Sequence, residues 1–322
     1  MAQTRVVAVS SVAFQNEATR FVPVPPLRRP VTVDDEPEWQ RVLERLQVWR
    51  AEHIEHDALA VVVRTPGAPP ALSATALSAT ALSATLASAD GEPAALIVGR
   101  HARADAHLPG ASLRQAAVLL WPEPSGARVV AVDLRTPSGL ATHRGIARRI
   151  SSDAALHFGA GDADVFALVA ARDRPFAVRS ADQLEAVVSG ALVDDAVPPP
   201  APASSAWERS VVLRTAALPM PVRDTLVVRA TRDEILRGVV LGRYERCHRT
   251  QALSDSLEVS RVHALLFAAA DALWIVDTGS TSGTRVVDGA RAIDLGEGRR
   301  IARLSPRARV LLAGVEVVVD IG

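Results

Sequence analysis

The chain has 322 residues, of which 48% are hydrophobic and 22% charged, so its composition is that of a folded globular protein with room for two domains. Its 36 basic and 36 acidic residues cancel, which argues against nucleic acid or an acidic membrane as partner. Every basic residue is arginine, and the lack of lysine excludes a Walker A phosphate loop and Schiff-base chemistry.

The single cysteine, Cys247, rules out an intrachain disulfide and a multi-cysteine zinc site. The adjacent His248 could form a thiolate pair with it, but neighbouring side chains on a strand or loop point apart, and we therefore expect an inert thiol in the loop before Ser260. No signal-peptide pattern and no stretch of 18 strongly apolar residues occur. His53 and His56 lack a third metal ligand. These features predict a cytoplasmic protein without membrane insertion, cofactor or metal.

Residues 1–56 predict an N-terminal strand-helix segment. Short alternating apolar runs between residues 4 and 25 are typical of strands. An acidic turn ending at Pro37 then opens an amphipathic helix. Its apolar stripe, from Trp39 to Ile54, is expected to pack against the core.

Residues 57–193 predict a first β-sandwich. A strand is expected at 58–63, followed by a low-complexity insertion at 64–90 that contains three copies of Ala-Leu-Ser-Ala-Thr and is expected to form a loop. Short apolar runs then alternate with turns to about residue 170. Ser180 with Gln183 forms a capping-box pattern, which predicts a short helix at 181–189.

The proline-rich stretch 194–206 predicts an interdomain linker, and residues 207–322 predict a second β-sandwich. The paired arginines at 148–149 and 299–300 are expected on solvated faces. The fold class is therefore all-β, with two sandwiches.

An internal repeat relates the two sandwiches. Three separated motifs recur at nearly constant separations, between 143 and 146 residues. They are Val98-Gly99-Arg100-His101 with Leu241-Gly242-Arg243-Tyr244, Leu119-Leu120-Trp121 with Leu265-Leu266-Phe267, and the segments 132–139 and 276–283. Such a constant register predicts two copies of one β domain.

The second copy resembles the forkhead-associated (FHA) domain, through Gly242-Arg243, then Ser260-Arg261-Val262-His263, then the loop from Asp277 to Thr284. The resemblance implies a β-sandwich whose loops at one end bind phosphothreonine peptides. It assigns peptide or phosphate contacts to Arg243, Ser260, Arg261, Thr281 and Ser282, and structural roles to Gly242, His263 and Gly283. The residue chemistry agrees, because a phosphate dianion requires charge-assisted donors.

One position departs from the family pattern. Ser282 stands where the family has an asparagine that contacts the backbone of the bound peptide. Its hydroxyl lacks the amide's separate donor and acceptor. We therefore expect the phosphate contacts to be intact and the contact with the backbone of the peptide to be weaker.

The first copy is expected to be degenerate. It keeps Arg100, but the register set by Leu119-Leu120-Trp121 replaces most of the other motif residues. In that register Arg114 takes the place of the serine, Gln115 of the next arginine, Ala117 of the histidine, and Pro137 and Leu140 of two threonines. An alternative register uses Ser112 as the serine. Either register predicts a domain that does not depend on phosphate.

The function predicted from these residues is a non-catalytic adaptor that binds a phosphothreonine-containing protein or peptide in bacterial Ser/Thr kinase signalling, with a kinase as a further partner. The alternative is a phosphorylation-independent scaffold of a secretion or other multiprotein assembly. An enzyme is not predicted, because no nucleophile, base and orienting group come together outside the motif residues.

Overall fold

The computed structural model is dominated by β-strands, as expected for an all-β protein. We refer to residues 36–193 as the N-terminal unit and to residues 225–321 as the C-terminal unit. The residues that the structure describes are 36–64, 80–88, 92–112, 114–123, 126–136, 139–142, 145–180, 183, 192–193, 225–247, 257–269, 272–296, 299–305 and 308–321. The predicted strands at 4–25 and the predicted linker at 194–206 lie outside them.

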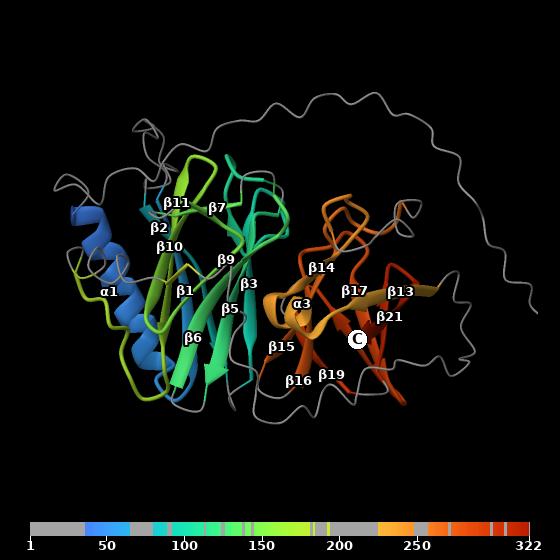
Figure 1. Cartoon of the computed structure of the whole chain (residues 1–322). Helices are drawn as coiled ribbons and strands as arrows, with labels where there is room; N and C mark the ends of the chain where they lie inside the picture. The colour runs from blue at the N-terminus through green and yellow to red at the C-terminus, as the bar shows by residue number, and fades with distance from the viewer. Residues whose placement is uncertain are drawn as a thin grey trace, which may run out of the picture.

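The elements stack in five layers, which run from the N-terminal helix at one side to the C-terminal strands at the other (Figure 1). The order is helix α1 (Glu36–Glu52), an outer and an inner sheet of the N-terminal unit, then an inner and an outer sheet of the C-terminal unit. An apolar cluster fills each of the four spaces between the layers.

The N-terminal unit has two six-stranded sheets among its described residues. The outer sheet has the order β2 (Thr80–Ser88), β1 (Asp57–Arg64), β11 (Ala163–Ala170), β10 (Ala155–Ala160), β7 (Leu140–Thr142) and β8 (Gly145–Ala147). The inner sheet has the order β12 (Leu192–Val193), β9 (Arg149–Ser152), β6 (Gly126–Asp133), β5 (Ala116–Glu123), β3 (Ala94–Gly99) and β4 (Ala106–His107).

The C-terminal unit has five described strands in its outer sheet and four in its inner sheet. The outer order is β13 (Thr225–Ala230), β21 (Val315–Ile321), β20 (Arg309–Leu312), β17 (Thr284–Asp288) and β18 (Arg291–Leu295). The inner order is β14 (Val239–Leu241), β15 (Ala264–Ala269), β16 (Ala272–Asp277) and β19 (Ile301–Leu304). The short helix α3 (Arg232–Arg237) begins at Thr231, where a capping box joins Thr231 and Glu234.

Both faces of each inner sheet are buried. Along β15, Ala264 and Leu266 face the core of their own unit, whereas Leu265 and Phe267 face the N-terminal unit. Successive residues of a strand point to opposite faces, so such strands are apolar throughout instead of alternating. The two inner sheets meet through Trp121 and Phe267, whose ring centroids are 5.1 Å apart.

The predicted N-terminal helix is confirmed as α1. Val42, Leu43 and Leu46 pack against the outer face of the first sheet, where Phe166 is also buried. Arg50, in the last turn, is 1% exposed, and its guanidinium group donates to five backbone carbonyls, among them those of Arg174 and Ala171. These bonds compensate for the burial of the charge.

The prediction of a loop over 64–90 was wrong for its last part. Residues 80–88 form strand β2, which pairs antiparallel with β1. A bulge between Val61 and Val62 adjusts the register. The apolar strand β1 supplies the pairing partner for these residues, although their own five-residue repeat has no two-residue period. Residues 65–79 lie outside the described part.

The helix predicted at 181–189 lies mostly outside the described residues, but its start is visible. The Ser180 hydroxyl accepts a bond from Gln183 N at 3.3 Å, and the Gln183 side chain accepts one from Arg179 N at 2.8 Å. Among the described residues, no helix is long and apolar enough to span a membrane.

Candidate functional site

Three loop segments of the C-terminal unit converge on Ser260. Its backbone N–H donates to His263 Nδ1 at 3.0 Å, and its carbonyl accepts from Arg243 N at 3.2 Å. Its hydroxyl oxygen accepts a hydrogen bond from Thr281 N at 3.0 Å. The structure therefore brings together four of the predicted site residues, namely Arg243, Ser260, Arg261 and Thr281, at one end of the unit.

His263 joins two of these segments from within the core. The side chain is fully buried, its Nδ1 accepts from Ser260 N, and its Nε2 donates to the carbonyl of Gly283 at 3.0 Å. This pairing requires the neutral Nε2–H tautomer, since Nδ1 is an acceptor. Burial lowers the pKa of His263 and so favours the neutral imidazole. The bond to Gly283 and the charge of Asp277 act in the opposite direction but are smaller effects.

Two glycines are required by backbone geometry. A Cβ atom at Gly242 would lie 2.2 Å from the carbonyl oxygen of Arg261, so only glycine allows the two segments to approach this closely. Gly283 has a φ of +76°, which side-chain-bearing residues rarely adopt. The backbone at both positions therefore favours glycine.

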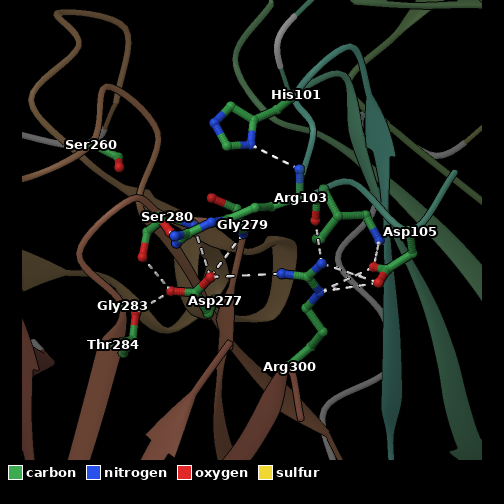
Figure 2. Close-up of polar contacts among 12 residues, drawn as sticks. His101, Arg103, Asp105, Ser260, Asp277, Gly279, Ser280, Gly283, Thr284 and Arg300 are labelled. Atoms are coloured by element: carbon green, nitrogen blue, oxygen red, sulfur yellow. Dashed lines mark hydrogen bonds and ion pairs between the residues drawn. The ribbon is translucent and has the colours of Figure 1, made fainter. Parts of the chain in front are cut away.

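Asp277 organises the loop that carries Thr281. Its Oδ1 accepts bonds from Gly279 N and Ser280 N, both at 2.8 Å. Its Oδ2 accepts from the hydroxyls of Ser280 at 2.6 Å and Thr284 at 2.8 Å (Figure 2). The carboxylate is fully buried, and these four bonds hold the loop against the end of β16.

The site presents positive charge that is not neutralised within it. Arg243 is half-buried, and its Nε has no hydrogen-bond partner among the residues that the structure describes, while Arg261 is exposed. Neither guanidinium group forms an ion pair with a carboxylate among the described residues. The Thr281 side chain is exposed, and the backbone N–H of Thr281 is bonded to the Ser260 hydroxyl. The arrangement suits an anion with several acceptor oxygens.

Ser282 is exposed at the edge of the same loop, and its hydroxyl donates to the carbonyl of Glu258 at 2.9 Å. The hydroxyl proton is therefore used within the protein. A hydroxyl oxygen remains as acceptor, without the donor that an asparagine amide provides.

Nothing in the sequence indicated three arginines around the Thr281 loop, namely Arg103 and Arg114 of the N-terminal unit and Arg300 of the C-terminal unit, of which Figure 2 labels Arg103 and Arg300. Arg300 forms a two-point ion pair with Asp105, with Nε–Oδ2 and Nη2–Oδ1 distances of 3.0 Å, and Arg103 and Arg114 donate to loop carbonyls. The pKa of His101 lies below its usual range, first because of burial and then because of the nearby charges of Arg114, Arg103 and Arg300. A separation of about 180 residues left no signal for these contacts in the sequence.

The prediction that the paired arginines lie on solvated faces was wrong for one member of each pair. Arg300 is 7% exposed and paired with Asp105, and Arg149 is 6% exposed. Arg149 donates to the carbonyl of Leu236 at 2.7 Å, and its guanidinium carbon lies 5.4 Å from the centroid of the Trp121 ring. Both therefore join the two units. Arg148 and Arg299 are exposed, as expected.

The hydrogen bonds settle the register of the N-terminal unit in favour of Ser112. Ser112 N donates to the Gln115 side chain at 3.3 Å, Gln115 Nε2 donates to the carbonyl of Gly139 at 2.9 Å, and Arg100 N donates to the carbonyl of Ser112 at 2.9 Å. These bonds repeat those around Ser260, so Gln115 takes the place of His263. The register that put Arg114 at the serine and Ala117 at the histidine was wrong.

The apparent match of Leu119-Leu120-Trp121 with Leu265-Leu266-Phe267 caused that error. Ala116 pairs with Asp133 as Ala264 pairs with Asp277, so the two strands correspond two residues away from the apparent match. A two-residue shift keeps every side chain on the same face of the sheet, and the apolar pattern therefore cannot detect it.

Cys247 is buried, and burial raises the pKa of its thiol to about 12. Its Sγ lies 3.3 Å from the carbonyl oxygen of Arg261. A thiol that stays protonated is a poor nucleophile, in keeping with the expected inert cysteine. Among the described residues, no group of three or more histidine, cysteine or acidic side chains is placed to hold a metal ion.

The comparison with protein families gives one match. The model of the FHA domain matches residues 239–311, a range that runs from the start of β14 into β20 and includes all the converging segments described above. No curated protein matches the chain. Residues 239–311 are therefore an FHA domain, a type of domain that serves in general as a phosphopeptide-binding module for protein interactions.

Proposed function

We propose that the chain is a non-catalytic adaptor that binds a phosphothreonine-containing protein or peptide, in bacterial Ser/Thr kinase signalling. The observation that carries the proposal is the hydrogen bonding of the Ser260 hydroxyl. Its hydroxyl oxygen already accepts the Thr281 N–H, so its own proton is left to donate. Ser260 precedes Arg261 in the chain, and its carbonyl accepts the N–H of Arg243 at 3.2 Å. Neither arginine has a carboxylate partner among the described residues.

A phosphate dianion matches this arrangement in charge and in hydrogen bonding. Two guanidinium groups balance its charge of about −2 at neutral pH. The buried Nε of Arg243, which has no hydrogen-bond partner in the described part of the chain, would gain an acceptor when the anion binds. The exposed Thr281 side chain would lie beside the phosphorylated residue. A Ser/Thr kinase is the class of enzyme that produces such a ligand.

The domain boundaries belong to the same proposal. We place the phosphopeptide-binding sandwich at 207–322 and a degenerate relative of it at 57–193, after the N-terminal segment 1–56. The hydrogen bonds of Ser112, Gln115 and Arg100 support this relation, since they repeat those of the C-terminal unit. The N-terminal unit carries Pro137 where the C-terminal unit has Thr281, and a proline has no N–H to donate to Ser112.

A second candidate function is a scaffold that binds its partners without phosphorylation. Ser282 favours it, because the hydroxyl that replaces the family's asparagine is bonded to the carbonyl of Glu258. The altered phosphate positions of the N-terminal unit favour it as well.

The experiment that tests the proposal compares two arginine variants of the full chain. Arg243→Ala removes one phosphate contact, and we expect it to weaken binding of a phosphothreonine peptide library by about 2–5 kcal/mol, because the phosphate loses a close charged partner. Arg299→Ala removes one exposed charge from the same unit and should bind as the parent does. Equal affinity of the Arg243→Ala variant and the parent for the phosphorylated library would contradict the proposal.

A further inference from the structure

The backbone of the Thr281 loop is held by the N-terminal unit through four consecutive carbonyl groups. Arg114 donates from Nε to the carbonyl of Thr278 at 2.9 Å and from Nη2 to that of Gly279 at 2.6 Å. Arg103 donates from Nη1 to the carbonyls of Ser280 at 2.6 Å and Thr281 at 2.9 Å. The sequence positions of donors and acceptors differ by 164 to 178 residues.

The backbone N–H groups and the backbone carbonyl groups of this loop bond to different units. Its N–H groups bond within the C-terminal unit, those of Gly279 and Ser280 to Asp277 and that of Thr281 to Ser260. Its carbonyl groups bond to the N-terminal unit. Thr281 therefore joins the two sets directly, because its N–H meets the Ser260 hydroxyl and its carbonyl meets Arg103.

The arginine that reaches Thr281 is itself fixed in position. Arg300 donates from Nη2 to the carbonyl of Arg103 and pairs with Asp105 at 3.0 Å (Figure 2). Asp105 also accepts a bond from Ile97 N of β3 at 2.7 Å, which ties the segment to the inner sheet.

The loop and the N-terminal unit also approach closely. A Cβ atom added at Gly279 would lie 3.3 Å from the carbonyl oxygen of Arg103, and the φ of Gly279 is +79°. A larger residue at 279 would push the loop away from the N-terminal unit and strain its backbone.

We propose that the phosphopeptide site is built by both units, with Arg103 and Arg114 as positioning residues that hold Thr281 and the Ser260 hydroxyl in the binding geometry before the ligand arrives. This inference rests on the proposed function of the same site. It gives the N-terminal unit a role that needs no phosphate site of its own. A loop that is already ordered loses less entropy when a ligand binds, so these contacts raise affinity without touching the phosphate.

The test uses the full chain and its affinity for a phosphothreonine peptide library. Arg103→Ala should weaken binding by about tenfold, within the usual range of coupling between sites. Arg103→Lys should recover most of the affinity, because a single nitrogen, Nη1, makes both carbonyl bonds and an ammonium group has three donors. Arg114→Lys should recover little, since Arg114 uses two nitrogens for two carbonyls.

The matched control is Arg149→Ala. Arg149 also joins the units through a bond to a carbonyl, that of Leu236, which lies outside the Thr281 loop. It should lower stability and leave phosphopeptide affinity unchanged. Equal losses of affinity in Arg103→Ala and Arg149→Ala, or parental affinity in Arg103→Ala, would overturn the inference.

Amide hydrogen exchange separates this inference from the proposed function, because it needs no ligand. In Arg103→Ala the Thr281 N–H should exchange faster than in the parent and in Arg149→Ala. Unchanged exchange at Thr281 would overturn the positioning role. Faster exchange in a protein that binds no phosphopeptide would retain the positioning role and contradict the proposed function.

Discussion

His263 and Gln115 show how two different side chains perform the same task. Each accepts a bond from the N–H of a serine three residues earlier and donates to the carbonyl of a glycine in the next loop. Imidazole and carboxamide groups both offer one acceptor and one donor at opposite ends. Sequence comparison treats them as unrelated, whereas the hydrogen-bond geometry makes them equivalent.

This equivalence gives a prediction for pH dependence. The folded protein keeps His263 neutral and lowers its pKa, whereas the unfolded chain takes up a proton near 6.5, so stability should fall as the pH drops below about 6.5. His263→Gln should keep both hydrogen bonds and reduce this loss. Denaturant unfolding at pH 7.5 and 5.0 measures the difference.

His263→Ala is the control for that experiment. It leaves Ser260 N and the carbonyl of Gly283 without their partner, at a cost of about 1–3 kcal/mol for each group. A His263→Gln variant that loses as much stability as His263→Ala, or that keeps the parental loss at low pH, would show that the glutamine does not replace the histidine.

Most individual site residues could be predicted from the sequence, because the motif residues lie on short local segments. Gly242, Ser260 and His263, which the resemblance to the FHA domain singled out, lie together and contact one another's segments. Arg103, Arg114 and Arg300 could not be predicted, since their partners are backbone carbonyls or acids of the other unit. Every residue has a backbone carbonyl group, so a bond to such a group cannot be predicted from the type of the accepting residue.

At the level of elements, a buried aspartate organises one loop in each unit, the loop after β6 in the N-terminal unit and the loop after β16 in the C-terminal unit. Asp277 accepts four bonds from the loop, and Asp133, at the end of β6, accepts bonds from Thr136 N and Thr136 Oγ1. An aspartate at the end of a strand thus starts the turn in each case. Burial raises the pKa of Asp133, although its bonds to Thr136 and Arg148 oppose the shift.

We therefore expect Asp277→Ala to disorder the Thr281 loop and to lower the stability of the protein. It removes the partner of two N–H groups and two hydroxyls and leaves Arg300 with Asp105 as its remaining acidic partner, at a cost of about 3–5 kcal/mol. Chemical denaturation should show the loss of stability, and a peptide titration the loss of affinity. A variant as stable as the parent would contradict the role of Asp277.

Strand β2 marks the limit of element prediction here. Its sequence repeat has neither a clear two-residue nor a helical period, so nothing local predicted a strand at 80–88. Pairing with β1 decides its structure. Tertiary context commonly overrides local preference in strands.

At the scale of the whole molecule, the burial of both faces of the inner sheets makes the two units one packed body. Ile97, Leu119 and Trp121 on one side meet Leu265 and Phe267 on the other, all of them buried. Each such side chain contributes about 1.5–3 kcal/mol by its removal from water. The Thr281 loop therefore lies against a support that apolar packing and the Arg300–Asp105 ion pair both hold in place.

The measurement that tests the central claim most directly is a fluorescence titration of the full chain with a degenerate phosphothreonine peptide library and with its unphosphorylated counterpart. Arg243 and Arg261 lie on the segments that meet at Ser260 and have no carboxylate partner among the described residues, which predicts saturable binding of the phosphorylated library and at least about tenfold weaker binding of the other. Equal affinity for both libraries would contradict phosphate recognition and favour the scaffold function, and no binding of either would contradict a peptide reader altogether.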